Sequence, residues 1–298
     1  MNETAVELRA AAPLRTFISD LSELTKSRLS LLVLFTTLTG FYLGSFSGIN
    51  PWLLIHTLAA TASLAAGAAV LNQVLETQAD ALMLRTRNRP LPSSRMREQD
   101  ALCLGIYLSG GGLAYLLLAT NLLAFSIAAL TLFSYLFIYT PLKRVTPLNT
   151  LIGAVPGALP PLIGWTAAGN PLNDGALALF LILFFWQMPH FLAIAWLYRE
   201  DYSKAGFRML TLNDASGQST AWKSLLHTLL LLPCGLAPYF LGMTGWIYLS
   251  GATFCGALYL AASLFFVRNP GHVSARRLFL ASIFYLPVIL LLLAIDKV

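Results

Sequence analysis

Charged residues are scarce in this sequence. They account for 11% of its 298 residues, whereas a soluble domain averages about 25%. This shortage argues against a water-soluble globule. In place of charge the chain has 57% hydrophobic residues, gathered in runs close to the roughly 20 residues that a helix needs to span hydrocarbon. The composition predicts an all-α polytopic membrane protein embedded in a lipid bilayer.

Cysteine is nearly absent as well. Cys103, Cys234 and Cys255 stand alone in apolar stretches, without C-x-x-C spacing. Such residues usually pack as small hydrophobic side chains, so the sequence supports neither a disulfide framework nor a thiolate metal site.

A secretory signal is also lacking at the amino terminus. Residues 1–28 are mixed and polar, without the basic start, short apolar core and small-residue cleavage site of such a signal. We expect them to form a retained cytoplasmic tail with room for an interfacial helix.

Nine apolar segments are long enough to cross a bilayer, and they predict one transmembrane domain over residues 29–298. They are residues 29–48, 52–75, 101–119, 122–140, 148–168, 175–197, 222–241, 246–267 and 278–295. A cytoplasmic amino terminus places 18 of the 19 lysines and arginines inside and only Lys297 outside. The positive-inside rule therefore predicts nine crossings and an external carboxyl terminus. The net charge of +6 reflects this topology and gives no reason to expect nucleic acid.

Asn72, Glu76 and Asp80 follow the second apolar segment at i, i+4 and i+8. On a helix this spacing places them along one slowly drifting stripe at the inner membrane edge. Two carboxylates on one stripe repel each other unless cations neutralise them. One solution is Mg²⁺ that bridges these oxygens to a substrate diphosphate. The other is an ordinary cytoplasmic loop with salt bridges.

Arginines follow this stripe directly, at Arg85, Arg87 and Arg89. The planar fork of arginine suits phosphate oxygens, although positive-inside topology also explains basic residues here. We expect Pro90 and Pro92 of "RPLP" to end the helix.

The later charged connectors hold further candidates. Lys143 and Arg144 fit either a site for an anion or the positive-inside pattern. Asp201 is a candidate ligand for a second metal ion and Lys204 offers a cation, but a solvated loop accounts for both equally well.

Two features at membrane depth predict an interior that is more than a packed bundle. Pro156, Pro160 and Pro161 cannot all be absorbed in a regular helix. Backbone groups freed at that depth are tolerated only against protein or a watered cavity, so the break predicts an internal cavity. His190, beside Pro189, is disfavoured in a lipid-facing position. A haem ligand, a proton-transfer group and a hydrogen-bonding partner for a neighbouring helix are the three roles open to it.

Four stretches carry a family resemblance: "NQVLETQADALMLRTRNRPLP" (72–92), "YTPLKRVTPLNTLIGAVPGALPPLIGW" (139–165), "WQMPHF" (186–191) and "REDYSKAGFRML" (199–210). Together they resemble the UbiA-type intramembrane prenyltransferases, and most closely their protohaem IX farnesyltransferase branch (haem O synthase). Three positions depart from the family pattern. Glu76 stands where the family usually has aspartate, Ser27 where it commonly has proline, and Ala205 where a second aspartate-rich motif would place a carboxylate.

The resemblance implies nine transmembrane helices around a central cavity, in the cytoplasmic (inner) membrane of a bacterium. It implies transfer of the farnesyl group of farnesyl diphosphate to the 2-vinyl group of haem b, with water addition, to give haem O and diphosphate. Mg²⁺ is the implied cofactor, and haem A synthase or a terminal oxidase assembly are the implied protein partners. The implied site residues are Asn72, Glu76, Asp80, Asp201 and His190 for catalysis, Arg85, Arg89, Lys143 and Lys204 for diphosphate binding, and Glu76, Asp80 and Asp201 for Mg²⁺.

Two other functions fit parts of the sequence. A sister enzyme that prenylates an aromatic quinone precursor would share the metal site, but "MLRTRNRPLP", "GALPPLIGW" and "REDYSKAG" favour the haem branch. A transporter fits the intramembrane prolines and the polar inner mouth. The gathering of carboxylates and phosphate-type cations on one side of the membrane, with nothing comparable outside, favours an enzyme.

Overall fold

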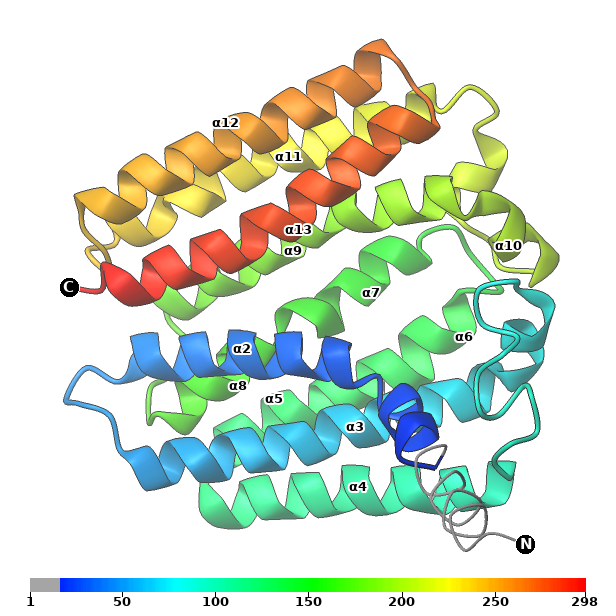
Figure 1. The fold of residues 1–298 in the computed structure, drawn as a ribbon. Coiled ribbons are helices and arrows are strands. Elements are labelled where there is room, and N and C mark those ends of the chain that lie inside the picture. Colours follow the sequence, from blue (N-terminus) through cyan, green and yellow to red (C-terminus); the bar gives the residue numbers. More distant parts are fainter. Residues whose placement is uncertain (1–16) are drawn as a thin grey trace, which may run out of the picture.

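The computed structural model describes residues 17–298, so most of the predicted tail, residues 1–16, lies outside the described residues. The described chain is almost entirely helical, and its only strand-like pairing is an isolated bridge between Thr244 and Lys297. Residues 17–24 are helical and precede the first long helix (Figure 1). The all-α prediction is confirmed.

The described residues form nine helical rods, which run roughly side by side (Figure 1). They are α2 (Ser27–Gly44), α3 (Pro51–Leu82), α4 (Glu98–Ala119), α5 (Leu122–Phe133) continued by the π-helix η1 (Ser134–Tyr139) and α6 (Thr140–Leu142), α7 (Asn149–Ala158) followed by α8 (Pro160–Ala167), α9 (Asp174–Leu197), α11 (Gln218–Phe240), α12 (Trp246–Arg268) and α13 (His272–Ile295). The short α10 (Arg199–Lys204) and the 3₁₀ turn η2 (Leu210–Asn213) lie in the connector between α9 and α11.

Eight of these rods in the described chain are long and apolar enough to cross a membrane. The remaining predicted span, residues 222–241, falls on α11, which packs against α9 and α12. Its amino-terminal half is rich in polar residues, including Lys223 and His227, and this lowers its mean hydropathy. Each predicted span therefore coincides with a helix, and the count of nine crossings stays a prediction.

Asparagine side chains begin three helices at the uncharged end of the bundle. Asn50, Asn121 and Asn173 each accept a hydrogen bond from the backbone N–H three residues later, at 3.2, 2.9 and 3.2 Å. These side chains satisfy backbone donors that have no partner inside the helix. The charged connectors lie together at the opposite end, on the right in Figure 1.

The helices that surround the site pack closely because small residues face one another. A methyl group on Gly40 of α2 would overlap the carbonyl of Pro161, and one on Gly164 of α8 would overlap the carbonyl of Thr37. Small residues allow backbones to approach closely within a membrane, where lipid provides no hydrophobic drive for association. α2 is thereby held against α8.

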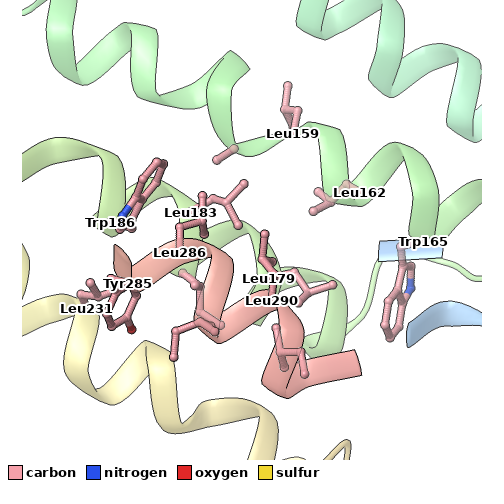
Figure 2. Close-up of a cluster of buried hydrophobic side chains, with 14 of the residues drawn as sticks. Leu159, Leu162, Trp165, Leu179, Leu183, Trp186, Leu231, Tyr285, Leu286 and Leu290 are labelled. Carbon is pink, nitrogen blue, oxygen red and sulfur yellow. The ribbon is translucent and has the colours of Figure 1, made fainter. Parts of the chain in front are cut away.

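A large apolar core joins the two sides of the bundle. Figure 2 shows Leu159 and Leu162 from the α7–α8 region near Leu179 and Leu183 of α9, with Leu286 of α13 beside them. This core fixes the positions of the helices that carry the site.

The break in the fifth span is confirmed at Leu159, between α7 and α8. Neighbouring helices satisfy carbonyl groups around it. Gln187 Nε2 of α9 donates to the carbonyl oxygen of Ala154 at 2.7 Å, and Thr37 Oγ1 donates to that of Pro160 at 3.2 Å. The freed backbone groups therefore face protein rather than lipid, as the physics of the bilayer core requires.

Candidate active site

A cavity of about 420 Å³ lies beside this break, among α2, α3, η1, α7 and α9. One face of α3 lines it through residues that recur every three to four positions, two of them as adjacent pairs: Thr61, Leu64, Ala65, Ala68, Ala69, Asn72, Glu76 and Asp80. Such spacing puts side chains on one face of a helix. The cavity is therefore apolar at one end and acidic at the other.

The acidic stripe lies on the last turns of α3, because this helix continues to Leu82. Asn72, Glu76 and Asp80 are 1%, 7% and 1% exposed and all line the cavity. The prediction that these three residues share one face of a helix is confirmed. Carboxylates this deeply buried require partners.

Each member of the stripe meets a cation from a different part of the chain. Lys143 Nζ lies 2.6 Å from Glu76 Oε1, and Arg89 Nη1 lies 2.7 Å from Asp80 Oδ2. The partner of Asn72 is Lys26, whose Nζ donates to Asn72 Oδ1 at 2.8 Å. All three cations line the cavity, so the site gathers positive charge beside its carboxylates.

The helix end differs from the prediction that the prolines of "RPLP" terminate it. α3 ends at Leu82, eight residues before Pro90, and the next residue, Met83, has extended backbone angles. Thr86 Oγ1 donates to the carbonyl oxygen of Asp80 at 2.9 Å and so satisfies a carbonyl at the helix end. The turn after α3, rather than proline, brings Arg89 back to the stripe.

Arg85 lines the mouth of the cavity, where it is exposed, and its guanidinium lies 5.4 Å from the centre of the Tyr198 ring. It forms no ion pair among residues 17–298. Its charge is therefore accessible to an anion entering the site.

Two tyrosines that the sequence analysis did not single out also line the cavity. The π-helix η1 carries Tyr135 and Tyr139, whose rings stack with centroids 5.8 Å apart. Lys143 Nζ lies 4.6 Å from the Tyr139 ring centre. A methyl group on Gly153 would collide with the Tyr139 ring, so glycine makes room for it. A π-helical turn is a frequent feature of functional sites, but its presence cannot be read from the "SYLFIY" sequence.

The pKa values of Lys26 and Lys143 shift in opposite net directions. Burial, reinforced by Arg89, lowers the pKa of Lys26 to about 7, and Glu76 opposes this shift. Burial also disfavours the charged form of Lys143, but Tyr139 and Glu76 outweigh it and raise the pKa of Lys143. An anion that enters beside these ammonium groups would favour their charged forms.

The second acidic position lies next to this cavity rather than in it. Asp201 of α10 is 9% exposed and is not among the lining residues, although Tyr202 and Phe207 of the same connector are. Phe207 packs against Ala79 of α3. Lys204 is exposed and also lies outside the lining.

The predicted trio of Glu76, Asp80 and Asp201 does not converge on one point. Within the described chain, no group of three histidine, cysteine, aspartate or glutamate side chains is placed to hold a metal ion. The reason is that α10 places Asp201 outside the cavity, while the other two carboxylates bind cationic side chains.

The donor set of α3 nevertheless fits Mg²⁺. Proteins commonly hold this ion through one or two carboxylates together with substrate phosphates and waters, rather than in an all-protein cage. Glu76 and Asp80 supply two carboxylates on one face, and the amide oxygen of Asn72 lies on the same stripe.

His190 does not line this cavity. Its Nδ1 lies 2.7 Å from Ser282 Oγ of α13, and its ring stacks between Trp186 and Phe279 with centroid distances of 5.2 and 5.1 Å. The cavity-lining residues of α9 are Gln187, Phe191 and Ile194. The structure thus favours the third role considered for His190, a hydrogen bond to a neighbouring helix.

Solved structures share this fold. A structure of digeranylgeranylglyceryl phosphate synthase matches with a TM-score of 0.79 at 18% identity, covering 94% of this chain and 98% of the other. A UbiA homolog from Archaeoglobus fulgidus bound to DMAPP and Mg²⁺ matches with a TM-score of 0.65 at 14% identity, covering 93% and 99%. These likenesses establish the fold.

Curated relatives resemble the chain over nearly its whole length. The protoheme IX farnesyltransferase of Solibacter usitatus is 42% identical and that of Myxococcus xanthus is 42% identical, with 93% and 97% of this chain covered and 98% of each relative. The mitochondrial protoheme IX farnesyltransferase of Arabidopsis thaliana is 39% identical over 93% of this chain and 64% of its own length. The resemblance to this branch is thereby confirmed.

The helices that build the cavity, from α2 to α9, fall almost wholly within residues 33–286, which match the UbiA prenyltransferase family. This match covers most of the chain, and the acidic stripe, the cations and the broken fifth span all lie inside it, apart from Lys26. The protein belongs to the UbiA prenyltransferase family.

Proposed function

We propose that this protein transfers the farnesyl group of farnesyl diphosphate to the 2-vinyl group of haem b, with addition of water, to give haem O and diphosphate. The observation that carries the proposal is a buried acidic stripe, surrounded by cations, at one end of an otherwise largely apolar cavity. The names of the curated relatives support the choice of farnesyl donor and haem acceptor.

The reaction requires that a carbon–oxygen bond break at C1 of the donor. The electron pair leaves with the diphosphate, and the π electrons of the vinyl group form a new bond to C1. Water then adds to the resulting cation beside the porphyrin ring and loses a proton. The protein must neutralise the leaving group and keep other water away from the cation until the bond has formed.

Arg85, Arg89 and Lys143 are suited to bind the departing diphosphate. Arg85 is free of ion pairs in the described chain, whereas Arg89 and Lys143 lie within 3 Å of carboxylates. When an anionic head group enters with a divalent ion, these two cations can turn from the carboxylates to the phosphates. Positive charge at the leaving oxygens lowers the barrier to bond breakage.

Asn72, Glu76 and Asp80 would hold Mg²⁺, with Asp201 in the adjacent connector as a candidate ligand for a second ion. When bound, Mg²⁺ neutralises charge that develops on the leaving diphosphate. Solved UbiA homologs bound to prenyl diphosphates and Mg²⁺ support this cofactor for the family fold.

The apolar end of the cavity is suited to the isoprenoid chain. Eleven residues of α3 separate Asn72 from Thr61, which corresponds to about 16 Å at 1.5 Å per residue. This length is of the same order as an extended farnesyl chain. Tyr139 lies beside Lys143 near the acidic end of the cavity, and Tyr135 stacks on it. Their ring faces can stabilise positive charge at the allylic carbon.

A direct assay tests this function. Membranes from cells that lack their own source of haem O, and that express this chain, are incubated with radiolabelled farnesyl diphosphate and Mg²⁺. Haem b or an aromatic quinone precursor is added as acceptor. We expect labelled haem O and release of diphosphate only with haem b. A labelled quinone precursor would assign the chain to a sister activity, and absence of Mg²⁺-dependent diphosphate release would contradict catalysis.

Location and partners extend the proposal. Reporter fusions at the connectors test the orientation, with the amino terminus in the cytoplasm of a bacterial inner membrane and Lys297 outside. Cross-linking in native membranes tests association with haem A synthase or a terminal oxidase assembly.

A further inference from the structure

We propose that Lys26 is an additional diphosphate-binding residue, positioned by an amino-terminal arm that consists of residues 17–26. The inference rests on the proposed function, because the anion it assigns to Lys26 is the head group of the prenyl donor. It assigns a role to a residue that lies before the part of the chain matched by the family and that the sequence analysis left without one.

Lys26 has an unusual backbone. Its angles, φ 47° and ψ 50°, are left-handed, and among the described residues only Lys26 and Ser94 combine a side chain with a positive φ. A lysine rarely adopts this region, and residues held there by their surroundings are often found at functional sites. At this position the chain turns from the helical residues 17–24 into α2 and points the side chain of Lys26 inward.

Among residues 17–298, the Lys26 ammonium is the cation of the stripe that has no carboxylate partner. Its hydrogen bond in the described chain goes to the amide oxygen of Asn72, at 2.8 Å. Lys143 and Arg89, by contrast, are each paired with a carboxylate. Because an ammonium has three donors and Asn72 accepts from one, Lys26 retains donors for phosphate oxygens in the cavity it lines.

Two contacts hold the arm in place. Arg95 donates to both carboxylate oxygens of Asp20, from Nε to Oδ2 at 3.2 Å and from Nη2 to Oδ1 at 2.9 Å, a two-pronged arrangement that fixes geometry as well as charge. Gln73 Nε2 donates to the carbonyl oxygens of Leu24 and Glu23, at 2.6 and 3.1 Å. Gln73 is the neighbour of Asn72, so α3 itself anchors the arm next to the residue that Lys26 contacts.

Apolar packing completes the support. Leu24 is fully buried in a small cluster with Val70, Leu91 and Ala101. Arg95 and Leu91 belong to the same connector as Arg85 and Arg89. The arm is thus attached to the segment that carries the other phosphate-binding cations, and Arg95 is a positioning residue for Lys26.

Binding of the donor, measured without an acceptor, tests this role. Purified protein is titrated with a non-reacting thiolo analogue of farnesyl diphosphate and Mg²⁺. We expect Lys26→Met to weaken binding by about 10-fold to 100-fold, the usual value of a hydrogen bond to a charged group. Lys26→Arg should recover part of the lost affinity. The matched control is Arg97→Met, which removes a cation exposed at the surface and paired with Asp100, and should bind the analogue as the parent does.

Steady-state kinetics test the role of Lys26, and a charge exchange between Asp20 and Arg95 tests whether the arm positions it. Lys26→Met should raise the KM for farnesyl diphosphate and leave that for haem b unchanged. Asp20→Arg and Arg95→Asp should each weaken donor binding several-fold, and the double variant should restore it. Unchanged analogue binding by a folded Lys26→Met protein overturns the proposal. Failure of the parent to make haem O would instead contradict the proposed function, and the binding result for Lys26 would still stand by itself.

Discussion

The Lys143 ammonium lies 2.6 Å from Glu76 Oε1, in an ion pair whose side chains are only 15% and 9% exposed. This pair joins the end of α6 to the acidic stripe of α3, across 67 residues of sequence. Its burial makes the two charges depend on each other, because each would be left without compensation if the other were removed.

Removal of one partner should therefore lower the free energy of unfolding more than removal of both. We expect Lys143→Met to lower the free energy of unfolding by about 3 kcal/mol, since it leaves the Glu76 carboxylate buried and unpaired. The Lys143→Met/Glu76→Gln double variant should recover much of that loss yet remain inactive. Thermal unfolding in detergent measures the first effect and haem O formation the second. A single variant as stable as the parent would contradict the pairing.

Asp80 should be essential for turnover and dispensable for folding. Asp80→Ala removes a carboxylate that lies next to Arg89 and on the proposed Mg²⁺ stripe. We expect an extractable, helical protein without detectable haem O formation. Near-normal product from this variant would remove Asp80 from the site. Asp100→Ala, which alters an exposed carboxylate outside the cavity, is the matched control.

Small side chains on α3 should set the length of the prenyl chain that is accepted. Ala65 lines the cavity about two turns from Asn72. Ala65→Phe fills the space beyond the reach of a shorter chain, so we expect kcat/KM for farnesyl diphosphate to fall at least 10-fold relative to that for geranyl diphosphate. Ala66→Phe introduces the same ring on α3 at a residue that does not line the cavity. Equal effects of the two variants would argue that the chain lies elsewhere.

His190 should contribute to packing rather than to chemistry. His190→Ala removes the hydrogen bond to Ser282 and the contacts with Trp186 and Phe279. We expect a loss of about 1 kcal/mol in stability, typical of a hydrogen bond between membrane helices together with its packing, and retention of haem O formation. A variant of normal stability with no turnover, or with an altered haem spectrum, would restore the haem-contact role expected from the sequence.

Low pH should destabilise the connector before α11, because Asp214 becomes protonated. Burial raises the pKa of Asp214, but hydrogen bonds from the Thr220 N–H and hydroxyl and from Ser216 outweigh it, so the pKa lies below its ordinary value. A carboxyl group with a depressed folded pKa stabilises the protein above its unfolded pKa of about 3.9, and this contribution disappears as pH falls through the folded value.

Asp214→Asn tests this pH dependence. The variant should be about 1 kcal/mol less stable at pH 7, the usual contribution of a side chain that accepts hydrogen bonds from backbone N–H groups at the start of a helix. The difference between parent and variant should narrow as pH falls from about 5 to 3. Melting temperatures in detergent across this range measure it, and a constant difference would show that ionisation of Asp214 is not involved.

Much of the site was predictable because its signals are local. The i, i+4, i+8 spacing of Asn72, Glu76 and Asp80 needs only a helix to become a stripe, and α3 supplies that helix. Pro160 cannot continue the backbone bonding of the preceding turn, and the helix breaks at Leu159. Arg89 and Lys143 were chosen for their charge, and both reach the stripe.

Other features depended on contacts between distant residues. Lys26 reaches Asn72 across 46 residues of sequence, and a left-handed backbone angle directs it there. His190 is on α9 like Gln187, yet the rotation of the helix turns it toward α13 and away from the cavity. Tyr139 enters the site through a π-helical turn that has no signature in its residue types.

Hydropathy and spacing along the sequence were enough to determine that the chain is helical and apolar, where its long helices lie and at which end its charge gathers. These properties follow from hydropathy and helical periodicity, which act over one or two turns. Only the tertiary structure decided which cation meets which carboxylate, which face of α9 borders the cavity and how deep that cavity runs. Those outcomes depend on how the helices rotate and pack against one another, and close packing is settled by side chains that are far apart along the chain.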